Sequence, residues 1–249
     1  MTNKKIKTRK NLLITVAMLV ILVVGSIGAY FTSTDTASNN FTVGQISIKL
    51  TEPAWTAQTD SDGDGTPDIA EKVLPNMKVD KDPTVTNLST TNDAFVFIRV
   101  TVPKANIITA NSVNGNRASN ATVTQLFQLN DASNTNSLNG LSWEGTDTYN
   151  ADSWYLVKSE TDDPDFNVYV FVYGNSAACT ALEAGQTTAK PLFNSVTFCN
   201  AVENQGLEKK DLTVQVDAYA IQTTNLTASG KTAPIDVWTI LNAQTVTNS

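Results

Sequence analysis

Beyond residue 44, hydrophobic positions recur with a period of two. Residues 45–50 alternate polar and apolar side chains, which places Ile46, Ile48 and Leu50 on one face of an extended segment. Residues 94–102, AFVFIRVTV, are apolar at nearly every position and rich in β-branched and aromatic side chains. The first pattern predicts a half-buried strand, and the second predicts a central strand covered on both faces.

Further segments of strand character are separated by clusters of Gly, Asn, Asp and Pro. They are 154–158, 167–173, 195–199 and 212–222. Such spacing is typical of an antiparallel β-sandwich, which we place over residues 45–249. Only residues 233–243 favour a helix, with Ile235, Trp238 and Leu241 at spacings of three. The sequence therefore predicts an all-β fold with one short C-terminal helix.

Residues 104–140 interrupt this pattern. Asn, Ser, Thr and Ala dominate the segment, and only residues 107–108 and 126–129 are apolar enough to anchor it. We expect a long surface excursion that leaves the core and returns to it.

The first 29 residues have the pattern of a secretory signal peptide. Residues 1–10 carry five cations and no acid, and the run from Leu12 to Val24 is almost wholly apolar before small residues follow. We expect cleavage between Ala29 and Tyr30. A single-span anchor is the alternative, because the run is longer than the ~7–15 residues of a usual signal and shorter than the ~20 that span a bilayer.

Loss of this leader makes the chain strongly acidic. The full sequence has 17 Lys+Arg and 24 Asp+Glu, a net charge of −7. Removing the five leader cations leaves 12 against 24, or −12. This balance argues against nucleic acid and anionic membrane surfaces as partners, since both require a basic patch. We expect a secreted protein that meets the membrane only through an uncleaved leader.

The two cysteines, Cys179 and Cys199, both lie beyond the leader. In an oxidising compartment they could form one disulfide. Two reduced, buried thiols are the alternative, and sequence spacing does not decide between them.

The sharpest local motif is DSDGDGTPDIAE, residues 60–71, which matches the EF-hand calcium loop position for position. Gly65 stands at position six, where a glycine permits the sharp turn that lets alternate side chains point at one cation. The candidate ligands are Asp60, Asp62, Asp64, the carbonyl of Thr66, Asp68 and Glu71. Pro75 leaves no room for a long exiting helix. We predict a structural calcium site, with an acidic, solvated turn as the alternative.

Groups that could perform catalysis are scarce. The chain has no histidine, which excludes histidine-dependent nucleophile systems and histidine-based zinc sites. Asp162, Asp163 and Asp165 surround Pro164 and resemble a solvated turn. We therefore predict that the protein is not an enzyme and assign no catalytic residues.

Several segments, taken in order, resemble the TasA/camelysin family of secreted matrix proteins of Gram-positive bacteria. The N-terminal resemblance comprises a small residue, an aromatic pair, a polar stretch and Phe-Thr-x-Gly, here Ala29, Tyr30 with Phe31, 32–40 and 41–44. Later matches are 73–102, 182–198 and 212–225. The 104–140 segment has no counterpart.

The resemblance implies a jelly-roll β-sandwich, leader removal by a SipW-type signal peptidase and assembly into extracellular fibres of a biofilm matrix or cell surface. In that family the mature N-terminal segment is donated to the sheet of the next subunit. The donor segment here would be 30–44, with Tyr30, Phe31, Phe41 and Val43 as its apolar side chains. The expected partners are further copies in a head-to-tail homopolymer, the signal peptidase, and other matrix proteins or the cell wall.

Alternatives to this assignment stay open. Segment 30–44 could instead form the first strand of its own domain or remain disordered. Asn76 stands where a glycine is common in the family, a change that asparagine tolerates because it can adopt the left-handed conformation. The rival functions are a camelysin-like metalloprotease, against which the absence of histidine argues, and a monomeric calcium-dependent surface adhesin.

Overall fold

The computed structural model describes six stretches of the chain, which are 45–111, 114–130, 137–138, 153–208, 210–226 and 232–244. The chain divides into two compact units, Met1–Val43 and Gly44–Ser249, and all described residues lie in the second. The described residues of that unit form a hydrophobic core. The predicted signal peptide, its cleavage point and the donor segment 30–44 lie outside the described residues.

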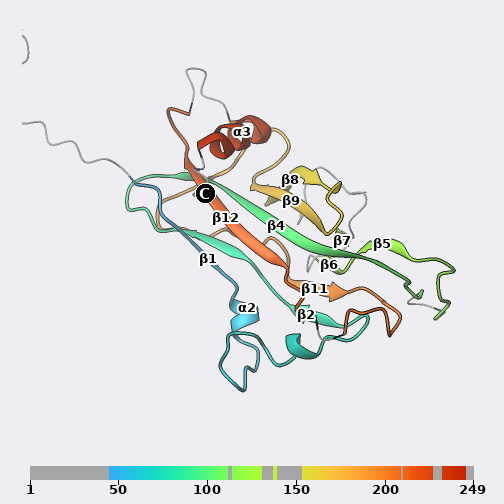
Figure 1. The fold of residues 1–249 in the computed structure, drawn as a ribbon. Coiled ribbons are helices and arrows are strands. Elements are labelled where there is room, and N and C mark those ends of the chain that lie inside the picture. Colours follow the sequence, from blue (N-terminus) through green and yellow to red (C-terminus); the bar gives the residue numbers. More distant parts are fainter. Residues whose placement is uncertain are drawn as a thin grey trace, which may run out of the picture. The chain divides into compact units, whose positions relative to one another are not determined.

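The described part is an antiparallel β-sandwich, as the sequence predicts (Figure 1). Its strands are β1 (Ile48–Thr51), β2 (Lys78–Asp80), β3 (Thr84–Asn87), β4 (Ala94–Ile107), β5 (Thr122–Gln125), β6 (Phe127–Asn130), β7 (Ser137–Leu138), β8 (Trp154–Glu160), β9 (Phe166–Tyr173), β10 (Ala181–Leu182), β11 (Ser195–Phe198) and β12 (Gln215–Gln222). The helices are α2 (Pro53–Thr56), the 3₁₀ turn η1 (Ala70–Lys72) and α3 (Pro234–Gln244). No helix among these is long and apolar enough to cross a bilayer.

The first sheet is built around β4. Strand β12 pairs along one side of β4, and β9 pairs along the other, followed by β8. Strands β10 and β5 pair with opposite ends of β4. The apolar run AFVFIRVTV thus occupies the centre of the sheet, and the prediction of a central strand is confirmed.

The second sheet has the order β2-β11-β6-β7, and β1 and β3 form a separate two-stranded sheet. Hydrogen bonds from Leu192 N to the Pro83 carbonyl (2.9 Å) and from Thr188 N to the Val85 carbonyl (2.9 Å) join the β3 region to the segment that precedes β11. Strand β1 then pairs with β3 through residues Ile48–Thr51. Its predicted apolar face packs against the main core through Ile46, Ile48 and Leu50.

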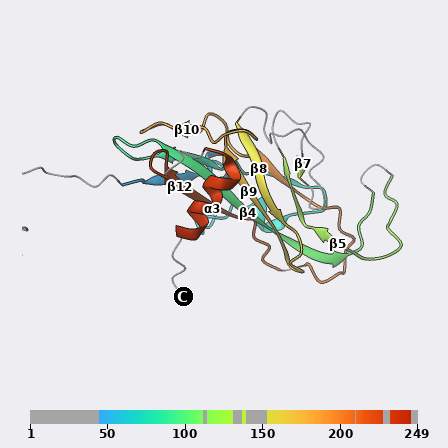
Figure 2. The same cartoon turned by 90° about the horizontal axis from the view of Figure 1, so that it is seen from above.

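The alternation of β4 divides the core into two clusters. One set of its side chains enters the space shared with the second sheet, namely Val96, Ile98, Val100 and Val102. The opposite set, Phe95 and Phe97, packs beneath α3, which lies across β12, β4 and β9 (Figure 2). The Phe97 and Trp238 rings are 5.4 Å apart. Strand β4 therefore lies in the middle one of three layers and is covered on both faces.

Helix α3 confirms the predicted C-terminal helix, but not all three of the apolar residues that predicted it are buried. Val237, Trp238 and Leu241 are buried against the first sheet. Ile235 is instead 52% exposed, since the helix turns Pro234 and Val237 inward in its place.

The predicted surface excursion 104–140 is too wide and requires correction. Strand β4 continues to Ile107 and pairs there with β5. Strand β6 belongs to the second sheet, and Leu126 and Leu129 are fully buried. The reason is backbone pairing, which places polar residues in strands without requiring an apolar pattern.

Candidate metal centre

The acidic loop 60–71 leaves the sandwich after α2 and returns at η1. A partly buried ion pair lies at its base, with Lys81 Nζ 2.7 Å from Glu52 Oε2 and 4.8 Å from the centre of the Trp55 ring. The Trp55 indole Nε1 in turn donates to the Gly65 carbonyl at 3.2 Å. The loop is thus attached to the start of the second sheet by side chains outside the motif.

Within the loop, backbone amides orient the carboxylates. Asp60 accepts hydrogen bonds from Gly63 N (2.7 Å) and Gly65 N (2.9 Å), and Asp64 accepts one from Thr66 N (2.7 Å). These bonds, that from Gly65 above all, lower the pKa of Asp60 below its ordinary value, so the carboxylate is favoured. Gly63 and Gly65 have φ of +77° and +91°, a region that favours glycine.

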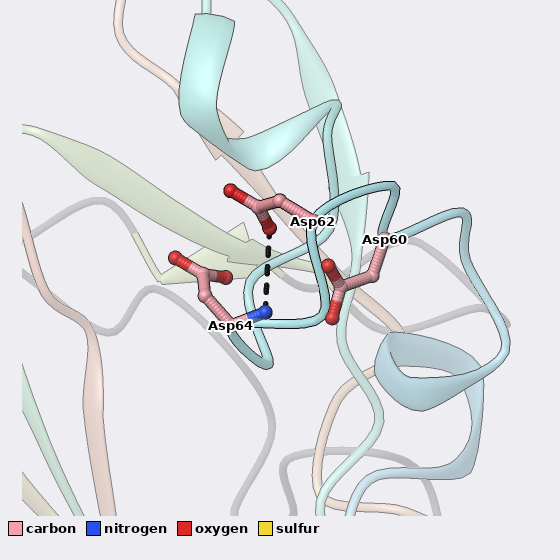
Figure 3. Close-up of side chains that lie close together, drawn as sticks. All are labelled: Asp60, Asp62 and Asp64. Carbon is pink, nitrogen blue, oxygen red and sulfur yellow. Dashed lines mark hydrogen bonds between the residues drawn. The ribbon is translucent and has the colours of Figure 1, made fainter.

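Three of the predicted ligands converge at one point. One carboxylate oxygen from each of Asp60, Asp62 and Asp64 lies within 4.8 Å of the other two (Figure 3). Asp62 also accepts a hydrogen bond from Asp64 N at 3.3 Å, the contact dashed in Figure 3. Carboxylate oxygens are the ligands that calcium prefers, and three negative charges so close repel one another until a cation offsets them. This donor set fits a hard divalent cation.

The other predicted ligands are placed differently. Both oxygens of Asp68 bind Ser61, one accepting from Ser61 N (2.7 Å) and the other from Ser61 Oγ (2.6 Å), which lowers the Asp68 pKa. Asp68 therefore closes the loop rather than joining the three carboxylates. Glu71 lies on η1 and is outside the converging group of carboxylates. The very short η1 agrees with the expectation that no long helix follows the loop.

The sequence did not predict the contacts that two residues of this region make with the loop. Ser61 is at position two of the motif, which carries no ligand role, and Trp55 precedes the motif altogether. A serine seven positions before an aspartate was the available signal for the Ser61–Asp68 pair. No local pattern indicated that Trp55 would reach Gly65.

Of the two alternatives for the cysteines, the structure has no disulfide between them: both are free, Cys179 buried and Cys199 partly buried. Cys179 belongs to the cluster under α3, whereas Cys199 packs against the main core on the other side of the first sheet. Burial raises the pKa of Cys179 to about 12 and that of Cys199 to about 11. Both thiols therefore stay protonated near neutral pH.

The second acid-rich segment, 162–165, forms an exposed turn. Asp163 Oδ1 accepts hydrogen bonds from Asp165 N (2.8 Å) and Phe166 N (2.9 Å). Its carboxylate thus satisfies the backbone of its own turn. Asn76, between the acidic loop and β2, has φ of +63°, in the left-handed conformation that we expected it to tolerate.

Comparison of the chain with protein families, with curated proteins and with solved structures found no match.

Proposed function

We propose that the protein is a secreted structural subunit that polymerises into extracellular fibres by donating segment 30–44 of one copy to a sheet of the next. The leader pattern and the acidic mature chain support export to the cell surface or matrix. The order of segments that resemble the TasA/camelysin family supports the mode of assembly. A dedicated signal peptidase would create the donor by cutting before Tyr30.

The observation that carries this proposal is the edge of the two-stranded sheet that β1 forms with β3. Among the strands that the structure describes, β1 pairs with β3 alone and is only four residues long. The unpaired side of an edge strand presents backbone N–H and C=O groups that an added strand can pair with. The candidate donor immediately precedes this strand. An interaction of this head-to-tail kind does not close on itself, so it generates a filament.

Calcium is the proposed structural cofactor. Asp60, Asp62 and Asp64 would bind the ion, with the Thr66 carbonyl and Glu71 as further ligands from the motif. The ion would neutralise the local repulsion and fix the loop against Trp55. In an extracellular setting such sites bind with a Kd of roughly 10⁻⁴–10⁻³ M.

The test is sedimentation velocity at fixed calcium, comparing the chain Tyr30–Ser249 with one that begins at Gln45. Because Gly44–Ser249 is a compact unit with its own core, the shorter chain retains the folded domain. We expect large polymers from the first and monomers from the second. Monomers from both, with calcium bound, would favour the monomeric adhesin instead.

A further inference from the structure

Strand β8 is an edge strand of the first sheet. Among the strands that the structure describes, it pairs with β9 alone, on the side of β9 away from β4 (Figure 1). Strand β12 also has a single partner, but β1 contacts it. The outer side of an edge strand presents backbone N–H and C=O groups that an extended chain can pair with. Strand β8 is therefore exposed to pairing with another copy.

The first half of β8 has the composition of a segment that pairs readily with its own kind. Residues 154–157 read WYLV, which are aromatic or branched apolar residues with no charge among them. Trp154 is buried, whereas the next three side chains are only partly buried. An apolar run of this kind at the edge of a sheet promotes aggregation unless neighbouring residues oppose it.

A β-bulge interrupts the strand directly after this run. Residues 154–156 pair with residues 171–173 in one register. Pairing resumes with Lys158 opposite Val170, so Val157 is the extra residue. Because of it, the backbone groups along the outer side no longer recur at every second residue, and the strand bends. The regular stretches before and after the bulge are three residues each, shorter than the ~5–6 of a usual strand.

An exposed ion pair follows the bulge. Lys158 Nζ lies 2.6 Å from Glu160 Oε1, and the two side chains are 48% and 52% exposed. Their partners on β9 are Val170 and Val168, so both charges lie on one face of the sheet. A pair so exposed contributes little to the stability of the domain. A strand added at β8 would, however, remove water from both charged groups, which opposes the addition.

The edge strand β1 lacks the bulge and carries fewer charges. It pairs with β3 in one continuous register from Ile48 to Thr51. Lys49 is its one charged residue. The backbone groups of β1 therefore keep the regular spacing that an added strand requires, whereas those of β8 do not.

We propose that the bulge at Val157 and the Lys158–Glu160 ion pair block β8 from pairing with the β8 strand of a second copy. The block acts whether or not segment 30–44 is a donor strand, because it concerns a different edge of the sandwich. If donation does occur, the block confines strand pairing between copies to the β1 edge. Filaments then grow end to end without merging side by side through β8.

The experiment compares the chain Tyr30–Ser249 with two variants of it. Lys158→Thr/Glu160→Thr removes both charges and keeps the bulge. The second variant adds deletion of Val157, which makes β8 regular. The deletion leaves position 158 opposite Val170, so no side chain after it changes face. Circular dichroism checks that each variant is folded.

The control is Glu203→Thr/Lys210→Thr, which removes the same two charges at exposed positions outside the strands. Sedimentation velocity measures association, and hydrogen exchange followed by mass spectrometry measures protection of residues 154–160. We expect the variant without charges or bulge to associate at a concentration at least about tenfold lower than the unmodified chain, with slower exchange in residues 154–160. The charge variant should change less, in the same direction.

Two results would overturn the proposal. One is equal exchange of residues 154–160 in all four chains at every concentration, because removing the bulge and the charges would then open nothing. The other is slower exchange of these residues in polymers of the unmodified chain than in its monomers, because β8 would then already pair. If the deletion variant is unfolded, the charge variant decides, since it keeps the backbone of β8. Dependence of polymers on segment 30–44 tests fibre formation separately.

Discussion

Two acid-rich turns of this protein have similar composition and different geometry. In the loop 60–71, glycines with positive φ and backbone amides direct Asp60, Asp62 and Asp64 towards one point. In the turn 162–165, Asp163 accepts hydrogen bonds from its own backbone. The difference indicates that spacing and glycine placement, rather than the number of acids, bring carboxylates together at one point.

The largest expected effect is the loss of calcium stabilisation on removing two of the converging charges. We predict that calcium at 100 times its Kd stabilises the chain by about 2.7 kcal/mol and that Asp62→Asn/Asp64→Asn abolishes this gain. Thermal unfolding with and without calcium measures it. The matched control is Asp162→Asn/Asp163→Asn, which should keep the full calcium response. An equal loss of calcium stabilisation in both double variants would contradict the difference between the two turns.

The next effect concerns the backbone of the loop. Gly65→Ala should cost about 1–2 kcal/mol of stability and weaken calcium binding, because φ of +91° strains any residue with a Cβ. No atom lies within 4 Å of the added carbon, so the cost is conformational. Gly185→Ala, at φ of +78° with equally open surroundings, serves as control. Calorimetric titration should find calcium affinity reduced in the first variant and unchanged in the second.

The smallest effect is on acid stability. The Asp60 pKa is lowered in the folded chain by the Gly65 and Gly63 amides, so ionised Asp60 contributes stability above its unfolded pKa of about 3.8. This contribution is lost as pH falls through the lower, folded pKa. In calcium-free urea unfolding between about pH 5 and pH 2, Asp60→Asn should therefore lose less stability than the unmodified chain. If the stability of the two chains falls in parallel with pH, the Gly65 and Gly63 amides do not stabilise the Asp60 carboxylate as described.

The sequence predicted the elements in which buried apolar side chains form a recognisable pattern. Strand β4 was recognisable because both its faces are buried and apolar, and α3 because Trp238 and Leu241 recur at helical spacing. The C-terminal part of β4 was missed because Pro103 and the polar residues after it suggest the end of a strand. Pairing with β5 holds this part in the sheet, and that pairing lies between segments with little apolar pattern.

The candidate site was predictable only in part for a similar reason. The motif located Asp60, Asp62 and Asp64, whose convergence follows from local turns. The pairing of Asp68 with Ser61 depends on how the loop closes, and the bond from Trp55 depends on where α2 meets it. The separation of Cys179 from Cys199 depends on which layer each joins, which no local pattern encodes.

The most direct test of strand donation is the binding of a synthetic peptide of residues 30–44 to the chain Gln45–Ser249, measured by calorimetry in calcium. We predict saturable binding of one peptide per chain, and inhibition by the same peptide of polymer formation by Tyr30–Ser249. A peptide with the same composition in scrambled order should do neither. If the folded, calcium-loaded domain binds neither peptide, segment 30–44 is not a donor strand, and the account of assembly is contradicted.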